Sequence, residues 1–457
     1  MLPQVTRGIS LACAPAYSGA MDDCSLLPVI GRDLRVPLVM GGEANYTNLD
    51  YAASTPALAV VAQHVTDILP LYASVHRGAG YASQVSTGAY ESARVVVGDF
   101  VGARPSDEVI FTRNTTDALN LLASVVPGET VVLDIEHHAN LLPWTVTDAR
   151  VVVSAATIAE TLLRVDAELA RRPAALLTVT GASNVTGELL PLRQLATIAH
   201  RYGTRLAVDG AQLVPHRRIN LTLEGVDYLA FSGHKLYAPF GAGVLVGRTD
   251  WLDRGTPYLL GGGAVTTVTL ESTGWRTGPA RHEAGSPNVL GVAALARAIE
   301  ELSTLDEREW TAHEETLRSR LVAGLASIHG VRILRIFEDS ADAVGVVSFS
   351  VDGVESGLLA AYLSAEWGIG LRHGKFCAHP LLARLGVTGP ALRASVGVGS
   401  VAADVDRLLE ALVAFQTVGP AASYEVHDGN WSLADDSREL PSWATAGAAA
   451  GSYGCAA

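Results

Sequence analysis

One apolar segment with a single lysine gives the first indication of what this chain is: Tyr228-Leu-Ala-Phe-Ser-Gly-His-Lys-Leu-Tyr-Ala-Pro-Phe-Gly-Ala-Gly243. Its first residues are typical of a buried strand, a small polar turn follows at Ser232, and Lys235 then stands between two apolar runs. Such a lysine is either a surface charge or a buried amine with a function. Burial lowers the pKa of an amine towards the nucleophilic range, but this run alone leaves both interpretations open.

An upstream segment with a carboxylate favours the functional interpretation. Arg205-Leu-Ala-Val-Asp-Gly-Ala-Gln212 is also a short apolar strand pattern that ends in polar residues. Ligands of open α/β sheets bind at the carboxyl ends of the strands, where Asp209 and Lys235 could share one crevice. Pyridoxal phosphate (PLP) needs both groups, because a lysine forms a Schiff base with it and a carboxylate keeps its pyridine nitrogen protonated. The two segments therefore predict a PLP site.

Further motifs in order along the chain allow a family to be named. Asp209-Gly-Ala-Gln212 and Ser232-Gly-His-Lys235, with matching segments from about residue 48 to about 412, resemble the class V aminotransferases of fold type I, specifically the SufS-type cysteine desulfurases. The resemblance implies an α/β fold with a mostly parallel central sheet between helices and a smaller α+β C-terminal lobe. It also implies PLP as cofactor, L-cysteine as substrate, and a persulfide on Cys377 that passes to a sulfur acceptor.

Length and composition exclude several other classes. The 457 residues exceed one ordinary domain, so we expect a large domain at 48–300, a small domain at 301–416 and extensions at 1–47 and 417–457, the last with a flexible end. The net charge of −14 argues against nucleic acid or an anionic membrane as the main partner. The four cysteines lack metal-ligand spacing, and neither a secretory signal nor a transmembrane run is recognisable. A reduced, cytoplasmic protein is expected.

Strand and helix patterns alternate through the first 300 residues. This alternation favours a mostly parallel sheet with helices on both faces. In this part of the chain, helices are predicted at about 81–101, 158–171 and 192–202. Beyond residue 300, in the smaller lobe, the predicted elements are a strand at about 344–350 and helices at about 356–367 and 401–415.

Several polar clusters follow predicted strands and are candidates for cofactor binding. Thr115 and Thr116 come where a helix should begin, and free N–H groups there suit a phosphate, although plain capping is the better explanation of this segment taken alone. The resemblance implies that both threonines contact the cofactor phosphate. His137 begins a His-His pair, which is a poor metal site because adjacent residues rarely face one ion. The resemblance gives His137 a role in stacking on the pyridine ring and in proton transfer. The resemblance also implies contacts of Asn184 and Gln212 with the ring oxygen of PLP, of Ser232 and His234 with its phosphate, and of Ser286 with the partner subunit's phosphate. It further implies that Asn184 contacts the substrate carboxylate.

The segment around Cys377 distinguishes among the activities of class V enzymes. It lies in Arg372-His-Gly-Lys-Phe-Cys377, and positive neighbours populate the reactive thiolate, although a free cysteine is more often a small buried apolar residue. The family form is close to RTGHHCAxP, so His373, Lys375 and Phe376 depart from it. The alternatives are a selenocysteine lyase, another C–S lyase, or a non-enzymatic protein of the same fold.

The substrate carboxylate calls for a guanidinium group. Arg393 is suitable because a guanidinium binds two oxygens at once, although a surface arginine is the alternative; Arg372 is the second candidate. By resemblance, Ala53 lies near the substrate, and His76 and Arg77 face the neighbouring subunit's site. One site built from two chains would make a homodimer necessary.

Overall fold

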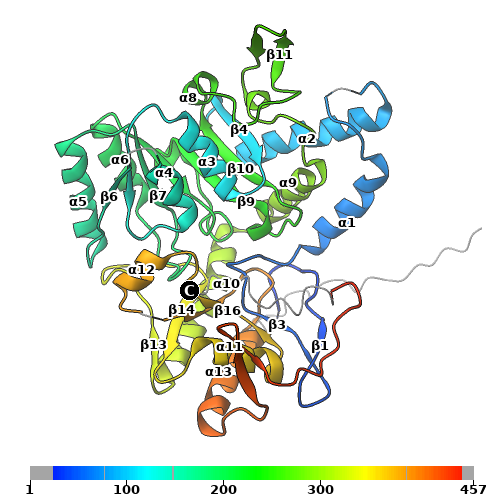
Figure 1. Ribbon diagram of the computed structural model, residues 1–457, viewed down its shortest axis with the longest axis vertical. Helices are drawn as coiled ribbons and strands as arrows, with labels where there is room; N and C mark the ends of the chain where they lie inside the picture. Colours follow the sequence, from blue (N-terminus) through cyan, green and yellow to red (C-terminus); the bar gives the residue numbers. More distant parts are fainter. Residues whose placement is uncertain (1–23, 77, 147–148, 388, 445–457) are drawn as a thin grey trace, which may run out of the picture.

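A seven-stranded sheet forms the centre of the larger lobe (Figure 1). The computed structural model describes residues 24–76, 78–146, 149–387 and 389–444. In the sheet, β10 is antiparallel to both of its neighbours, and the strands from β9 to β6 pair in parallel. In spatial order the strands are β4 (Asp107–Thr112), β10 (Gly243–Arg248), β9 (Tyr228–Ser232), β8 (Arg205–Asp209), β7 (Leu176–Thr180), β5 (Thr130–Leu133) and β6 (Ala149–Val152).

Helices cover both faces of this sheet, and alternate strand residues enter two separate cores. Val131 and Leu133 pack in the core that contains residues of α1, α2, α5, α6 and α9, whereas Val132 packs in the core with α3, α4 and α8. Strands buried on both faces read as continuous apolar runs, as these do. The bounds are α1 (Ala59–Ile68), α2 (Tyr81–Phe100), α3 (Thr115–Val125), α4 (Leu142–Thr145), α5 (Ile158–Arg171), α6 (Leu192–Arg201), α7 (Leu221–Glu224), α8 (Thr249–Arg254) and α9 (Val289–Ser303).

The smaller lobe has its own antiparallel sheet, with a core shared with three helices. Its sheet comprises β13 (Val331–Ile333), β14 (Val346–Val351), β17 (Ala391–Ser395) and β16 (Arg372–Gly374). The three helices are α10 (Glu307–Ser327), α11 (Ser356–Trp367) and α13 (Ala402–Thr417), whereas the short α12 (His379–Arg384) packs Leu381 and Leu382 into the core of the larger lobe. Figure 1 shows β16 and α12 on the side of this lobe that faces the larger one, so the loop between them lies at the junction of the lobes.

Both ends of the described chain pack on the smaller lobe. The N-terminal part contributes β1 (Arg35–Pro37), β2 (Glu43–Asn45) and β3 (Thr47–Asn48), and β3 pairs in parallel with β15 (Ile369–Gly370). The C-terminal part forms a hairpin of β18 (Tyr424–His427) and β19 (Asn430–Leu433). Glu366 of α11 anchors it by accepting hydrogen bonds from the Ala421 and Ala422 amides and the Tyr424 hydroxyl. The domain boundaries given above stay predictions.

The predicted fold class is confirmed, and the predicted elements occur close to the expected positions. Two of the five helices, α5 and α11, have the predicted bounds, and β14 begins two residues after the predicted start. Local chemistry explains such agreement: Thr157 caps α5 by accepting a hydrogen bond from the Glu160 amide, and Gly368 ends α11 in the left-handed conformation.

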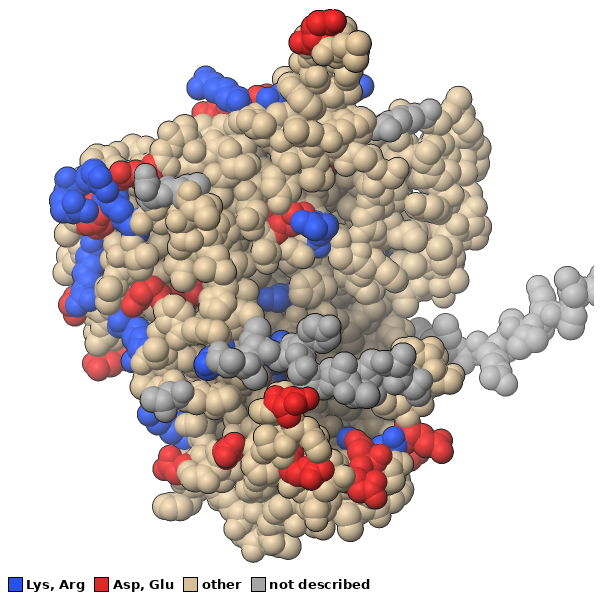
Figure 2. Space-filling view, in the orientation of Figure 1, with Lys and Arg blue, Asp and Glu red and all other residues tan. Residues whose placement is uncertain are grey.

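Charge is unevenly distributed over the surface. On the face drawn in Figure 2, acidic side chains predominate on the smaller lobe, and many of the basic ones lie along one edge of the larger lobe. Helix α5 lies at that edge in Figure 1, and its residues form ion pairs such as Arg171 with Glu168 and Arg201 with Asp166. Within the described ranges, no helix has both the length and the apolar character needed to cross a membrane.

Candidate active site

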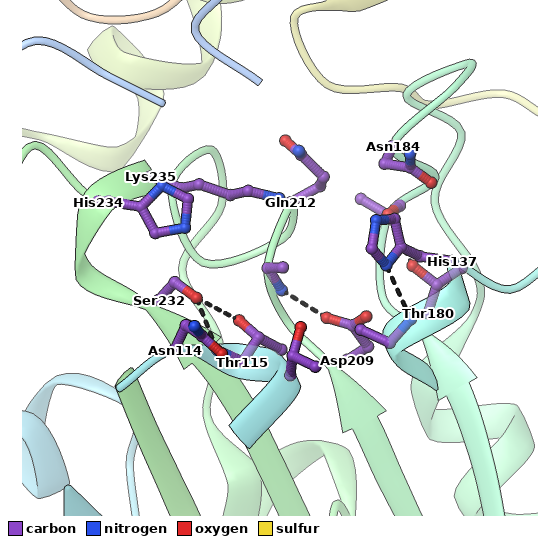
Figure 3. Close-up of a pocket in the computed structure, with 14 residues that line it drawn as sticks. Asn114, Thr115, His137, Thr180, Asn184, Asp209, Gln212, Ser232, His234 and Lys235 are labelled. Carbon is purple, nitrogen blue, oxygen red and sulfur yellow. Dashed lines mark hydrogen bonds between the residues drawn. The ribbon is translucent and has the colours of Figure 1, made fainter. Parts of the chain in front are cut away.

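A pocket lies at the carboxyl ends of the central strands, where the sequence predicts it (Figure 3). Strand β8 ends at Asp209 and β9 at Ser232, and the short helix η4 (Gly233–Lys235) follows β9 directly. The start of α3 closes the pocket from below in Figure 3. The lining residues are Asn114, Thr115, Thr116, His137, Ala139, Thr180, Ala182, Asn184, Asp209, Ala211, Gln212, Ser232, His234 and Lys235.

Lys235 and Asp209 bring an amine and a carboxyl group into this pocket. Burial lowers the pKa of Lys235 to about 8, against the opposing effect of the negative charges of Asp209 and Cys377. The amine therefore has a sizeable neutral, nucleophilic fraction near neutral pH. Burial also raises the pKa of Asp209, although a hydrogen bond from the Ala211 amide at 3.0 Å opposes the shift. A positively charged partner would hold Asp209 ionised, and a protonated pyridine nitrogen is such a partner.

Another part of the pocket offers donors suited to a phosphate. Asn114 caps α3 by accepting a hydrogen bond from the Asp117 amide at 2.9 Å, so Thr115 and Thr116 form the first turn of the helix. The Ser232 hydroxyl lies 2.7 Å from the Thr115 amide and 2.6 Å from the Thr115 hydroxyl. Burial lowers the pKa of His234 to about 4, so this ring is neutral and can donate an N–H to an anion. Hydroxyls, a neutral imidazole and a helix N-terminus together fit a phosphate.

His137 presents a neutral ring to the same pocket. Burial, with the nearby charge of Lys235, lowers the pKa of His137 to about 3. Its Nδ1 accepts a hydrogen bond from the Ala139 amide at 3.0 Å, which leaves the proton on Nε2. An uncharged imidazole is well suited to stack on a pyridine ring. The low pKa makes it a poor proton acceptor at neutral pH.

Gln212 carries a polar atom that the described residues leave without a partner. Its Nε2 donates to the Ala52 carbonyl at 2.6 Å, whereas its Oε1 is buried and has no hydrogen-bond partner in the described part of the chain. A buried acceptor of this kind is costly unless a ligand supplies a donor. The expected contact between Gln212 and the ring hydroxyl of PLP meets this need. The pocket residues thus fit the cofactor.

Arg393 lies at the border of the pocket and the smaller lobe. It is 4% exposed, its Nη1 donates to the Asn184 carbonyl at 2.9 Å, and its Nη2 lies 3.3 Å from Asp50 Oδ1. Its Nε is buried and has no hydrogen-bond partner among the residues described. That edge of the guanidinium can accept a substrate carboxylate. Arg372 lies opposite Arg393 in the register of β16 and β17, but its side chain is exposed.

Cys377 approaches the pocket from the smaller lobe. It lies between β16 and α12, is partly exposed, and its carbonyl accepts a hydrogen bond from the His138 amide at 2.8 Å. Its negative charge would raise the pKa of both Lys235 and Arg393, so the sulfur is electrostatically coupled to both groups. The loop therefore brings a thiol to the amine and guanidinium of the pocket.

Besides Cys377, Arg393 and Arg372, three predicted residues that the structure describes, Ser286, His76 and Ala53, do not line the pocket of this chain. Ser286 is exposed, and His76 is exposed and lies 2.8 Å from Glu91. Arg77 lies outside the described residues. Ala53 is half-buried next to Ala52, the partner of the Gln212 amide. The roles of Ser286, His76 and Arg77 towards a neighbouring subunit stay predictions.

Two acidic residues of the site were not anticipated. Glu136 is fully buried, and its carboxyl accepts hydrogen bonds from Asn140 Nδ2 at 2.7 Å and the Thr180 amide at 3.0 Å. Burial raises the pKa of Glu136 to about 8. Asp50 pairs with Arg393. Glu136 directly precedes His137, so its position in the motif was a signal, whereas the sequence around Asp50 contains none that points to Arg393.

The aminotransferase class-V family profile matches residues 47–408. The chain belongs to the class V aminotransferases. The relatives of this class V chain include a "Probable cysteine desulfurase" of Pseudomonas aeruginosa, 39% identical over 383 residues that cover 80% of this chain and 92% of the relative. A "Probable cysteine desulfurase" of Vibrio cholerae is 35% identical over 377 residues, 80% of this chain and 92% of the relative.

Solved structures give the same result. The apo cysteine desulfurase of Thermococcus onnurineus aligns with a TM-score of 0.74 at 31% identity, over 80% of this chain and 93% of that one. The cysteine desulfurase CsdA of Escherichia coli aligns with a TM-score of 0.70 at 34% identity, over 80% of this chain and 94% of that one. The class V chain shares its fold with both.

Proposed function

We propose that this class V chain is a PLP-dependent cysteine desulfurase that converts L-cysteine to L-alanine and leaves a persulfide on Cys377. The observation that carries the proposal is the convergence of Lys235, Asp209 and Arg393 with a cysteine loop from the second lobe. Relatives named cysteine desulfurase that align over about 80% of the chain support it. The decisive test is to incubate the protein with L-cysteine and to measure alanine and sulfur bound to Cys377.

Two groups of pocket residues would hold the cofactor. Asp209 and Gln212 would hold its ring, with His137 stacked on one face and Lys235 linked to it. The phosphate would bind to a larger set, namely Thr115, Thr116, Ser232 and His234, with Ser286 from the partner subunit. When bound, PLP supplies an electron sink for the charge that develops at the substrate Cα.

The chain's own residues would then carry out the remaining steps. Lys235, with its pKa of about 8, can accept and return the proton at the substrate Cα near neutral pH. Arg393, with Asn184, orients the substrate carboxylate. The Cys377 thiolate attacks the substrate sulfur, an S–S bond forms as the C–S bond breaks, and the electron pair of that bond stays with the carbon. Protonation of this carbon gives alanine, so L-cysteine and Cys377 thiol become alanine and Cys377 persulfide.

The altered cysteine loop favours a second candidate, a selenocysteine lyase or another C–S lyase. Lys375 and Phe376 replace the two histidines of the family form before Cys377, so the surroundings of the attacking sulfur differ. Turnover of L-cysteine, selenocysteine and S-substituted cysteines under the same conditions separates the two. A strong preference for either of the latter would favour the lyase.

The persulfide implies partners beyond the substrate. We propose a homodimer in which Ser286, His76 and Arg77 act at the neighbouring subunit's site, and an acceptor protein or thiol that receives the sulfur. The cytoplasm suits this chemistry because Cys377 must return to a thiol. The molar mass in solution tests the dimer.

Asp209→Asn should reduce alanine formation by at least about 100-fold, because a neutral amide cannot keep the pyridine nitrogen protonated. The variant is nearly isosteric and can still accept the Ala211 hydrogen bond, which limits structural damage. Steady-state assays with a PLP titration provide the measurement. Turnover close to that of the original protein at saturating PLP would contradict the assigned role.

Arg393→Lys should raise the KM for L-cysteine by about 10- to 100-fold, because an ammonium keeps the charge but cannot bind a carboxylate through two parallel hydrogen bonds. PLP affinity should stay unchanged. Arg372→Lys is the matched variant, for which we expect a smaller effect because Arg372 is exposed. Equal effects in both variants would refute the assignment of the main contact to Arg393.

A further inference from the structure

The residue that precedes Cys377 contacts the proposed carboxylate-binding arginine. Phe376 is 5% exposed, and the Cζ of Arg393 lies 5.2 Å from the centroid of its ring. A guanidinium group over an aromatic face is attracted by the electrons of the ring. Phe376 is therefore bonded to Cys377, whose thiol attacks the substrate sulfur, and also contacts Arg393, which is proposed to bind the substrate carboxylate.

The backbone at this point is held in an unfavourable conformation. Phe376 has a φ of 53° and Cys377 a φ of 51°, both in the left-handed region that residues with a Cβ disfavour. Consecutive residues remain there only when surrounding contacts hold them. Two such contacts come from the larger lobe: Asn184 Nδ2 donates to the Phe376 carbonyl at 2.8 Å, and the His138 amide donates to the Cys377 carbonyl at 2.8 Å. The loop is thus fastened across the junction of the lobes.

The same contacts restrict how a carboxylate can reach Arg393. Phe376 covers one face of the guanidinium, the Asn184 carbonyl accepts from Nη1, and Asp50 lies beside Nη2. The buried Nε remains for a ligand, as it has no partner in the described ranges. A carboxylate bound at this edge would hold Arg393 in the orientation in which its face meets the Phe376 ring.

We infer that Phe376 is a positioning residue that couples carboxylate binding at Arg393 to the placement of the Cys377 thiol. This inference rests on the proposed function. Coupling between two binding equilibria is reciprocal, so a bound carboxylate stabilises the docked loop, and the docked loop strengthens carboxylate binding by the same factor. The phenylalanine at this position, which departs from the family form, thereby links substrate binding to the position of the nucleophile.

The experiment measures alkylation of Cys377 by iodoacetamide in the PLP-loaded protein, with and without saturating L-alanine. L-Alanine offers a carboxylate but no sulfur, so no turnover intervenes. In the original protein, L-alanine should slow alkylation about tenfold, a typical coupling factor. Phe376→Ala should be alkylated faster and should lose the effect of L-alanine. Phe415→Ala is the control, because Phe415 packs on Tyr362 in the same lobe, with ring centroids 5.0 Å apart.

A second variant tests whether the coupling needs the aromatic ring of Phe376 or only its apolar volume. Phe376→Leu keeps apolar volume but not the ring, and we expect it to lose the L-alanine effect while it remains folded and PLP-loaded. It also decides the matter if Phe376→Ala fails to fold. In cysteine turnover both variants should show a higher KM, because the docked loop no longer strengthens carboxylate binding, and a lower kcat, because the thiol is less well placed.

The possible outcomes distinguish this inference from the proposed function. If both Phe376 variants match Phe415→Ala in alkylation and in the L-alanine effect, the positioning role is wrong. The same conclusion follows if Phe376→Leu retains the full effect of L-alanine. If the original protein forms no Cys377 persulfide from L-cysteine, the proposed function fails, whatever the alkylation shows.

Discussion

Replacing Lys235 by alanine should reduce alanine formation by more than about 1,000-fold, because the variant lacks both the covalent attachment of PLP and the group that moves the Cα proton. Positioned proton transfer alone accounts for about 10²- to 10⁴-fold in enzymes. Borohydride reduction followed by peptide mass spectrometry should find the pyridoxyl group on Lys235 of the original protein.

The small number of lysines in the chain allows a complete control for this test. Lys235 and Lys375 are its only two lysines. Lys375→Ala is therefore the complete matched control, and it should keep the label on Lys235. A pyridoxyl group on Lys375, or substantial turnover by Lys235→Ala without added amine, would refute the assignment.

Replacing Cys377 by alanine should lower sulfur transfer from L-cysteine by at least about 100-fold, since no other group in the proposed mechanism attacks the substrate sulfur. The expected measurement is mass spectrometry of the protein after incubation with L-cysteine, which should show the mass of one added sulfur on the Cys377 peptide. PLP binding should be retained, because Cys377 does not line the pocket of the cofactor.

Cys24→Ala provides the comparison for Cys377. Cys24 is exposed near the N-terminal end of the described chain, and its loss should leave both turnover and the added sulfur unchanged. Unaltered alanine release by Cys377→Ala would remove the thiol from the mechanism and would favour an enzyme that eliminates sulfur directly.

These two residues come from different lobes, and their meeting depends on how the lobes are joined. Buried polar contacts tie the junction together: Glu314 of α10 pairs with His216 and with Arg217, which follow the turn that carries Asp209 and Gln212. The His138 and Asn184 contacts secure the cysteine loop on the other side. The site is thus assembled by tertiary contacts that hold a strand-end pocket against a separate lobe.

Much of the pocket could be predicted from the chain alone, because its determinants are local. An apolar strand followed by a polar turn specifies where Asp209, Ser232 and Lys235 lie, and parallel strands necessarily bring such ends to one edge. A capping residue likewise specifies the start of α3. These features depend on residues within a few positions of each other.

Other features of the site are contacts between residues that lie far apart in the sequence, and local sequence patterns do not predict them. Asp50 and Arg393 are 343 positions apart, and their ion pair exists only because β3 joins the smaller lobe. The Phe376 ring contacts Arg393 from a loop whose two left-handed residues, Phe376 and Cys377, are held by Asn184 and His138 of the larger lobe. Propensity and periodicity describe short segments, whereas the packing of lobes selects which distant side chains meet.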